Sequence, residues 1–353
     1  MAMLKRNRIL LGLTAVVLAA TSAWAQPPAQ TPPPPCAAGA DFVCGQRAPE
    51  DLVVVPGGQW VVAGAYAGAG GLFVIRASDK TSTLAYPSAT AAARFDQKTY
   101  AGCPGAPDAA AQAKFQTHGL SLQPGGNGVH KLYVVLHGPR ESIEVFEVDA
   151  RKGTPTLTWV GCAVAPMPIG LNSVRWLPDG GFIATNFLPR GGDPEAFKRL
   201  LGGERNGELW EWHTASGWQK VPGSEASGAN GIEISDDGRT LYVAAWGSQS
   251  FFRLSRGQAT PAREEVKLGF MVDNIRWAAD GSILAAGQVS PFGGANPSSV
   301  VVKIDPRTLA VREILRQTNT PAFSNGTVAV EVGKEMWVGS FRGDRIAIFP
   351  LPK

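Results

Sequence analysis

The sequence NSVRWLPDGGFIAT at residues 172–185 is one copy of a unit that the chain repeats. Asn172 is followed seven residues later by the turn Asp179-Gly180, and an apolar segment at 182–185 follows the turn. The same offset separates three other dipeptides from a turn and an apolar segment, namely Glu50-Asp51, Asn230-Gly231 and Asp273-Asn274. Because independent turns have no reason to share a register, the four units predict a repeated β-hairpin.

Two further segments, 129–137 and 332–340, resemble the same hairpin and bring the number of copies to six. The copies start about 43 to 72 residues apart, and most of this range fits the period of a four-stranded propeller blade. The sequence therefore predicts an all-β fold, a six-bladed β-propeller. A β-sandwich or barrel is the alternative, but neither explains the constant offset. One short helix is expected at 194–201, with Asp193 as its N-cap, Pro194 at its first position and Gly202-Gly203 at its end.

The first 25 residues have the features of a secretory signal peptide, with an apolar run at 9–20 and the cleavage site Ala23-Trp24-Ala25. Lys5, Arg6 and Arg8 contribute three charges to the net charge of +4, which leaves +1 for the rest of the chain. We therefore expect an exported protein, periplasmic or extracellular, with a proline-rich leader at 26–40 and a catalytic propeller domain at 41–353. The remaining basic residues are scattered, and no later apolar run is long enough for a membrane span, so neither nucleic acid nor a membrane is an expected partner.

The four cysteines indicate two disulfides in an oxidising compartment. Three pairings are possible, and we favour Cys36–Cys44 together with Cys103–Cys162. The spacing of these residues lacks the paired CxxC motifs that are typical of a zinc site.

The residues at the repeated offset provide the candidate metal ligands. In a propeller the innermost strand of each blade lines the central channel, so these residues are expected to face one another at one mouth of it. They provide two carboxylates and three side-chain amides, a set that suits calcium: Glu50, Asn172, Asn230, Asp273 and Asn274. Each of them taken alone has an ordinary structural explanation as a turn or capping residue, but their shared offset favours a metal site.

Two of the four histidines are candidates for chemistry. His118 lies at the start of a unit, and His137 ends a predicted strand. A histidine near a metal-bound ester can act as a general base toward water. For His130 and His213 we expect structural roles. No GxSxG, P-loop, HExxH or Rossmann motif occurs in a suitable context, which argues against a serine nucleophile.

Seven short motifs occur in a fixed order along residues 50–340: EDL at 50–52, HGLS at 118–121, LYVVLH at 132–137, NS at 172–173, TN at 185–186 leading to DP at 193–194, ANGI at 229–232 and VDNI at 272–275. In these motifs the chain resembles the paraoxonase/arylesterase/lactonase family, six-bladed propellers related to the gluconolactonase and regucalcin-like group. Members of this family hydrolyse lactones and, more promiscuously, aryl esters and sometimes phosphotriesters.

The resemblance implies a catalytic calcium held by the five oxygen ligands named above, with His118 and His137 as a pair above the metal. It also implies that the loop and helix at 194–201 lie beside the cleft. The family's disulfide to the C-terminus cannot form here, because no cysteine follows Cys162.

Some family members carry a second, structural calcium, bound through the equivalents of Asp51, the Leu120 carbonyl and the residue at Ser173. That residue is usually an aspartate, and serine here removes a charge. Since calcium affinity depends partly on the number of charged ligands, a second ion is expected to bind weakly or not at all.

The leading hypothesis is a calcium-dependent hydrolase of small-molecule lactones or aryl esters, in which a histidine activates water. One alternative is a sugar lactonase of the gluconolactonase type, which relies on the metal ligands and an aspartate and needs no histidine pair. Another is a non-catalytic propeller used for binding, with a purely structural metal.

Overall fold

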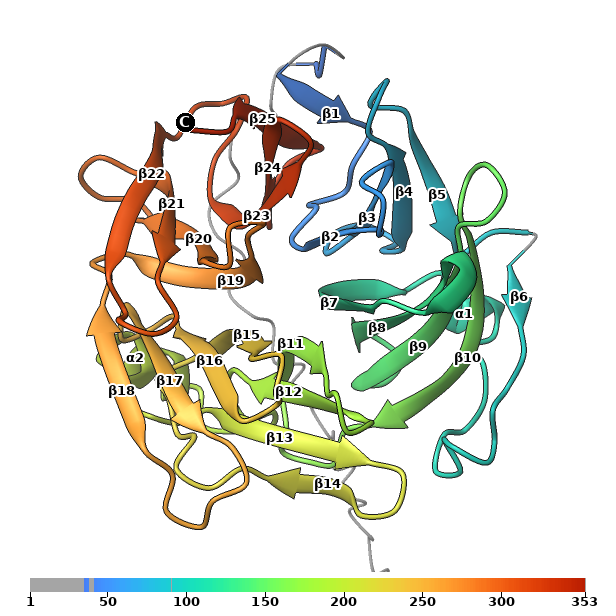
Figure 1. Cartoon of the computed structure of the whole chain (residues 1–353), viewed down its shortest axis with the longest axis horizontal. Coiled ribbons are helices and arrows are strands. Elements are labelled where there is room, and N and C mark those ends of the chain that lie inside the picture. Colours follow the sequence, from blue (N-terminus) through green and yellow to red (C-terminus); the bar gives the residue numbers. More distant parts are fainter. Residues whose placement is uncertain (1–34, 38–40, 90, 353) are drawn as a thin grey trace, which may run out of the picture. The chain divides into compact units, whose positions relative to one another are not determined.

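The computed structural model describes residues 35–37, 41–89 and 91–352, so the expected signal peptide and most of the proline-rich leader lie outside the described residues. Six sheets, antiparallel except for one short edge strand, are arranged around a common axis, as Figure 1 shows. The prediction of an all-β, six-bladed propeller is therefore confirmed. Within the described residues, no helix is long and apolar enough to cross a membrane.

The blades follow one another along the chain, with inner strands β2, β7, β11, β15, β19 and β23 nearest the axis (Figure 1). The first three blades are β2–β5 (Leu52–Val54, Trp60–Gly64, Leu72–Arg76, Ser82–Tyr86), β7–β10 (Gln116–Gln123, Val129–His137, Ser142–Asp149, Thr156–Val164) and β11–β14 (Leu171–Trp176, Phe182–Asn186, Glu208–His213, Gly217–Lys220). The next two are β15–β18 (Ala229–Ile234, Thr240–Ala245, Ser250–Ser255, Arg263–Lys267) and β19–β22 (Met271–Trp277, Ile283–Val289, Ser298–Ile304, Val311–Thr318). The last blade consists of β23–β25 (Gly326–Val332, Glu335–Ser340, Arg345–Pro350) and β1 (Phe42–Cys44).

The last blade closes the ring with strands from both ends of the fold. β1 pairs antiparallel with β25, so that Phe42 lies opposite Ala347. Backbone hydrogen bonds between these strands join segments that are far apart in sequence, and they cover an edge of β25 that would otherwise be open. In the second blade a short fifth strand, β6 (Ala92–Ala93), pairs in parallel with β10 at the outer edge.

Two segments expected from the sequence coincide with strands. The bounds of 129–137 match β8, and the apolar segment at 182–185 lies within β12. The segment at 332–340 covers the last residue of β23, the following turn and the whole of β24, so the hairpin begins earlier than expected, at Gly326. Strand positions were therefore well predicted where apolar residues fill a buried strand without interruption.

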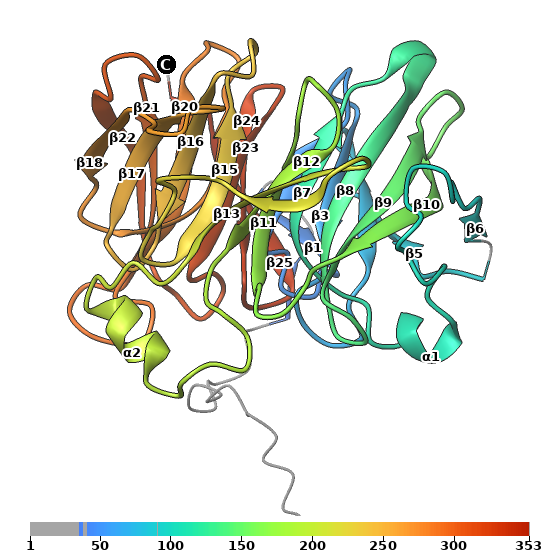
Figure 2. The ribbon, with the colours of Figure 1, turned by 90° about the horizontal axis from the view of Figure 1, so that it is seen from below.

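The helices differ from the prediction. α2 spans Ala196–Leu201, with Glu195 as its N-cap and Gly202 as its C-cap. Asp193 does not cap the helix but accepts a hydrogen bond from the Glu195 N–H at 2.8 Å, so it belongs to the turn before the helix. A second helix, α1 (Ala109–Gln112), was missed because four residues are too few to show a helical period. Both helices lie in loops on the same side of the blades, as Figure 2 shows.

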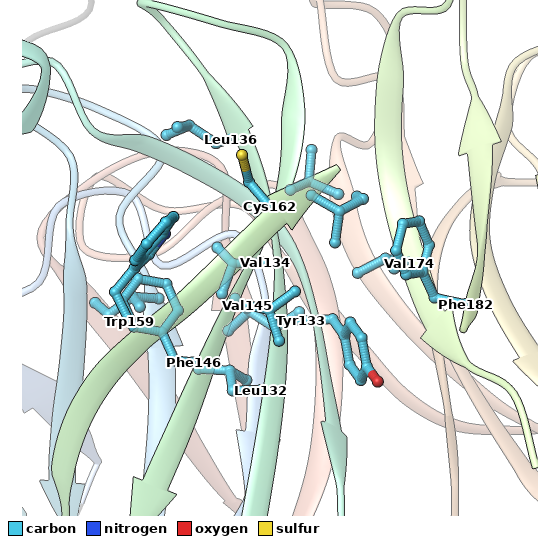
Figure 3. Packing of buried hydrophobic residues seen from close by; sticks show 14 of the residues in the cluster. Leu132, Tyr133, Val134, Leu136, Val145, Phe146, Trp159, Cys162, Val174 and Phe182 are labelled. Carbon is cyan, nitrogen blue, oxygen red and sulfur yellow. The ribbon is translucent and has the colours of Figure 1, made fainter. Parts of the chain in front are cut away.

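The first three blades share one continuous hydrophobic core, which Figure 3 shows around the second blade. Trp159 and Phe146 are almost completely buried there. Tyr133 of β8 lies 5.7 Å from Phe182 of β12, measured between ring centroids, so this contact joins the second and third blades. Truncating a buried aromatic side chain to alanine typically costs about 3–5 kcal/mol, so such contacts hold neighbouring blades together.

The two favoured disulfides, Cys36–Cys44 and Cys103–Cys162, are both present. Cys36–Cys44 lies at the end of β1, and Cys103–Cys162 ties the loop before α1 to β10. Their sequence separations are 8 and 59 residues. The longer loop restricts the unfolded chain more strongly.

We predict that replacing both Cys103 and Cys162 with alanine lowers the free energy of unfolding by about 4 kcal/mol, because the cross-link no longer limits the entropy of the unfolded chain. The matched control is alanine at both Cys36 and Cys44, whose shorter loop gives a smaller loss. Urea unfolding of the two variants measures both values. A larger loss in the Cys36 and Cys44 variant would contradict the prediction.

Candidate metal and catalytic site

The inner strands break their regular pairing at the residues that the sequence repeat singled out. In each of blades two to five, two residues of the inner strand bulge out of register with the next strand. A β-bulge bends the strand and re-aims its side chains. The residues in these bulges are His118-Gly119, Asn172-Ser173, Asn230-Gly231 and Asp273-Asn274. For Asn172, Asn230 and Asp273 the constant offset in the sequence therefore corresponds to a bulge, whereas Glu50-Asp51 directly precedes β2, which pairs with β3 without a bulge.

Neighbouring inner strands approach each other closely at two of these bulges. A Cβ atom on Gly231 would lie 2.6 Å from the carbonyl oxygen of Asp273, on the next inner strand. A Cβ atom on Gly119 would lie 2.5 Å from Cα of Ser173. Only glycine leaves room for this approach, and the approach brings the polar side chains of adjacent blades together.

The five expected metal ligands are buried, and contacts connect them with one another and with His118. Asn274 donates from Nδ2 to Oε1 of Glu50 at 2.6 Å. A hydrogen bond from Asn230 favours the ionised form of Asp273. Asn172 lies on the other side, where its Nδ2 is 3.4 Å from Nε2 of His118. The structure thus brings together at one end of the inner strands all five residues that the sequence predicted.

The same residues present four buried oxygen atoms that have no hydrogen-bond partner: Glu50 Oε2, Asn172 Oδ1, Asn230 Oδ1 and Asn274 Oδ1. Leaving a buried acceptor unsatisfied costs about 1–3 kcal/mol. Four such atoms in one set of residues are explained if they face a cation, and hard cations such as calcium bind carboxylate and amide oxygens. The residues present therefore fit a calcium ion.

Burial also destabilises the charge of the two carboxylates. Burial raises the pKa of Glu50 well above its ordinary value, and repulsion from Asp273 and Asp51 adds to this effect. Burial raises the pKa of Asp273 to about 7, although Gln288 and Asn230 favour its ionised form through hydrogen bonds. A bound cation opposes both shifts, because it stabilises the ionised forms.

A chain of three side chains leads to this set of ligands. Nδ1 of His137 lies 3.0 Å from Oε2 of Glu141, and Nε2 of His137 lies 2.9 Å from Nδ1 of His118. If each imidazole donates from Nδ1, Nε2 of His118 carries no proton and can accept the hydrogen bond from Asn172. That nitrogen also lies 3.7 Å from Oε1 of Glu50. Burial and the neighbouring His137 lower the pKa of His118 well below its ordinary value, which favours the neutral base.

Glu141 was not predicted from the sequence, where its only signal is that it follows His137 by four residues. Its second oxygen, Oε1, accepts a hydrogen bond from the Leu171 N–H at 2.7 Å. Glu141 therefore joins the loop after β8 to the start of β11, one residue before Asn172. Tyr66 was missed as well, and its ring lies 4.6 Å from that of His118.

Residues outside the ligand set, on the side where α2 lies, hold Asp273 in place. Gln288 donates to Oδ2 of Asp273 at 2.7 Å and accepts from the indole N–H of Trp246 at 3.0 Å. Trp246 in turn contacts three aromatic rings, those of Phe187, Phe197 and Phe292. Trp246 and these three phenylalanines form an apolar wall beside the ligand set. Nothing in the repeat signalled this wall, because its members come from loops of three different blades.

The other two histidines have structural surroundings, as expected. His130 is buried and accepts a hydrogen bond at Nδ1 from the Gly125 N–H at 3.1 Å. His213 lies on β13, away from the axis, 3.5 Å from Glu211.

The residues expected for a second ion also lie together. Oδ2 of Asp51 accepts a hydrogen bond from the Leu120 N–H at 2.7 Å. Ser173 is completely buried, and its hydroxyl oxygen has no hydrogen-bond partner. Both Asp51 and the Leu120 carbonyl contact the guanidinium group of Arg276, a residue that the sequence analysis did not consider.

Comparison with known proteins adds information on the fold. No protein-family model matches the chain, and no curated protein matches it by sequence. Among solved structures, a gluconolactonase from Xanthomonas campestris is 15% identical, with 88% of each chain covered and a TM-score of 0.54. The chain has the fold of the gluconolactonase-type propellers. A luciferin-regenerating enzyme is 12% identical, with 88% of this chain and 93% of the other covered and a TM-score of 0.53. At such low identities the likeness establishes the fold alone.

We predict that Gly231→Ala lowers the free energy of unfolding by about 1–3 kcal/mol, because the added methyl group collides with the backbone beside Asp273. Gly102→Ala is the matched control, since a Cβ atom there meets nothing within 4 Å. Urea unfolding of both variants measures the difference. Equal stability of the two would show that the inner strands do not need this close approach.

Proposed function

We propose that the chain is an exported, calcium-dependent hydrolase of lactones or aryl esters. The observation that carries the proposal is the position of His118. Its Nε2 atom lies at the end of a carboxylate–imidazole–imidazole chain and within 3.7 Å of an oxygen of Glu50, one of the proposed calcium ligands. A base beside a metal site is the arrangement that metal-assisted hydrolysis of an ester by water uses.

The ligand set supports calcium in particular. Its two carboxylates and three amides are all oxygen donors. Carboxylate and amide oxygens are the donors that calcium binds, whereas softer metals prefer thiolate or imidazole ligands. Bound calcium supplies a Lewis acid that stabilises negative charge on the substrate's carbonyl oxygen.

The histidine chain provides the proton transfers. His118 accepts at Nε2 a proton from the attacking water, and the water oxygen forms a bond to the carbonyl carbon. Glu141 supplies the negative charge opposite the positive charge on His118, and His137 connects the two through its hydrogen bonds. When the bond from the carbonyl carbon to the alkoxy or aryloxy oxygen breaks, His118 returns the proton to that leaving oxygen and becomes neutral again.

The surroundings of the site support an apolar substrate group. Trp246 and its aromatic neighbours border the side of Asp273, and Tyr66 borders His118. Phe292 belongs to this wall and remains 55% exposed, so it is accessible to a ligand. Such a wall suits the acyl chain of a lactone or the ring of an aryl ester better than the hydroxyl groups of a sugar lactone.

Export is supported by the two disulfides in addition to the expected signal peptide. Disulfides form and persist in oxidising compartments such as the periplasm or the extracellular medium.

The direct test is a panel of lactones, phenyl acetate and sugar lactones, assayed after chelation and again after calcium is restored. We expect hydrolysis of apolar lactones or phenyl acetate that calcium restores. Full activity in the presence of a chelator would exclude the calcium mechanism. Tight calcium binding without hydrolysis of any compound would favour a non-catalytic binding propeller.

Asp273→Ala is expected to abolish this hydrolysis and to remove the thermal stabilisation that calcium gives, because a ligand carboxylate couples ion binding to folding. The control is Asp236→Ala, which removes an exposed carboxylate outside the ligand set. Calorimetric titration with calcium and thermal unfolding compare the two variants. Unchanged calcium affinity in Asp273→Ala would remove Asp273 from the site.

His118→Gln is expected to slow hydrolysis by about 10²–10⁴-fold, the usual effect of losing a general base, while calcium binding persists. His130→Gln is the matched control, because it replaces a buried histidine outside the site. If His118→Gln keeps its full rate while Asp273→Ala loses it, the sugar-lactonase alternative with no histidine requirement is favoured.

A further inference from the structure

Arg276 is a buried cation in the interior of the ring. It lies on the inner strand β19, and it is 8% exposed. Its guanidinium donates to four acceptors: from Nη2 to Oδ2 of Asp51 and to the Leu120 carbonyl at 3.0 Å, from Nε to the Leu52 carbonyl at 3.3 Å, and from Nη1 to its own neighbour, the Ile275 carbonyl, at 2.7 Å.

These acceptors come from three blades. Asp51 and Leu52 belong to the first blade, Leu120 to the second and Arg276 to the fifth. Asp51 is completely buried, and it also accepts hydrogen bonds from the N–H groups of Leu52 at 2.8 Å and Leu120 at 2.7 Å. Burial raises the pKa of Asp51, and Arg276 with these two donors opposes that shift. A carboxylate and carbonyl oxygens from separate blades therefore converge on one cationic group.

Oxygens that converge in this way form the kind of ligand set that holds a divalent cation. They include the Asp51 carboxylate and the Leu120 carbonyl, which the family resemblance assigns to a second calcium. We propose that the Arg276 guanidinium takes the place of that second ion, so that the chain holds a single exchangeable metal and fills the other cation position with its own side chain.

The charges at this position are balanced for a monovalent cation. Asp51 supplies one negative charge, and the third residue of the expected ligand set, Ser173, supplies none. A guanidinium carries one positive charge at all accessible pH values and presents several donors in a plane, so it can satisfy a carboxylate and two carbonyls together. A divalent ion in the same place would leave one positive charge uncompensated within this set of three ligands.

The equivalent arginine of another blade shows that this arrangement is specific to Arg276. Arg175 occupies the same place in the repeat, three residues after Asn172 as Arg276 is three residues after Asp273. The Nε atom of Arg175 lies 2.8 Å from Oε2 of Glu233. The charge of Arg175 is therefore balanced by Glu233. Arg175, Glu233 and Arg276 line a common cavity of about 270 Å³, which lies next to Leu120 and Ser121.

The inference concerns a position other than the catalytic one, and its test needs no activity measurement. Calcium bound per full-length chain is counted by titration after dialysis against a chelator. We expect the unmodified chain to bind no more than one calcium ion tightly. The single variant Ser173→Asp is expected to bind no additional ion, because Arg276 still fills the position. The double variant Ser173→Asp with Arg276→Ala supplies two carboxylates and no guanidinium, so we expect it to gain one ion.

Arg175→Met is the matched control, since it removes a partly buried guanidinium at the same place in the repeat and is expected to gain no ion. Two tight ions in the unmodified chain, or no gain in a folded double variant, would overturn the inference. A count of zero in the unmodified chain with one ion gained in the double variant would refute the proposed catalytic calcium but support this inference.

A second measurement remains informative if the double variant does not fold. Thermal unfolding of the single variant Arg276→Ala is compared with that of Arg276→Lys, which keeps a positive charge but loses the planar set of donors. We expect Arg276→Ala to melt about 5–15 °C lower than the unmodified chain, because Asp51 loses its partner, and Arg276→Lys to recover part of the loss. Equal melting temperatures for Arg276→Ala and the unmodified chain would show that Arg276 does not compensate Asp51.

Discussion

The close approach of the inner strands around the axis is the constraint on which the rest of the structure depends. Gly119 and Gly231 permit backbone separations that no side chain would tolerate, and the bulges at these positions direct polar side chains inward. Polar groups that are removed from water must be paired with one another or with an ion. The chemistry near the axis follows from how this requirement is met.

The ring meets the requirement in two ways. Around Asp51 the converging oxygens are satisfied by a guanidinium of the same chain, through contacts with Arg276. Around Glu50 and Asp273, four oxygen atoms remain without a partner, and we propose that calcium occupies that position. The distinction has a functional meaning, because a side chain fixes a charge permanently, whereas an exchangeable ion leaves coordination positions for substrate and water.

The proposed site also depends on ring closure. Glu50 comes from the first blade and its backbone carbonyl accepts a hydrogen bond from Thr327 of the last, at 2.6 Å. The histidine chain is shared between the second blade, which carries His118 and His137, and the third, which Glu141 contacts through the Leu171 N–H. The pairing of β1 with β25 closes the ring. The distance between the first and last blades therefore depends on a strand contact far from the proposed site.

The sequence by itself determined the repeat, and through it the fold and the level at which the site lies. The offset between Asn172 and its turn recurs in the units of Asn230 and Asp273 because these three units form the same bulged hairpin, and the pattern of apolar residues gave β8 its bounds. The local sequence pattern did not predict α1, because this helix has few residues. It also misplaced the start of α2, because a local turn decides where that helix begins. What only the tertiary structure decided is which side chains from different blades meet. Glu141, Gln288 and Arg276 each acquire a role from a contact across strands, and Arg175 shows that the same residue in the same repeat position can have another partner. A repeat in the sequence fixes the position of a residue within its blade, but its electrostatic partner depends on which blades closure of the ring places opposite each other.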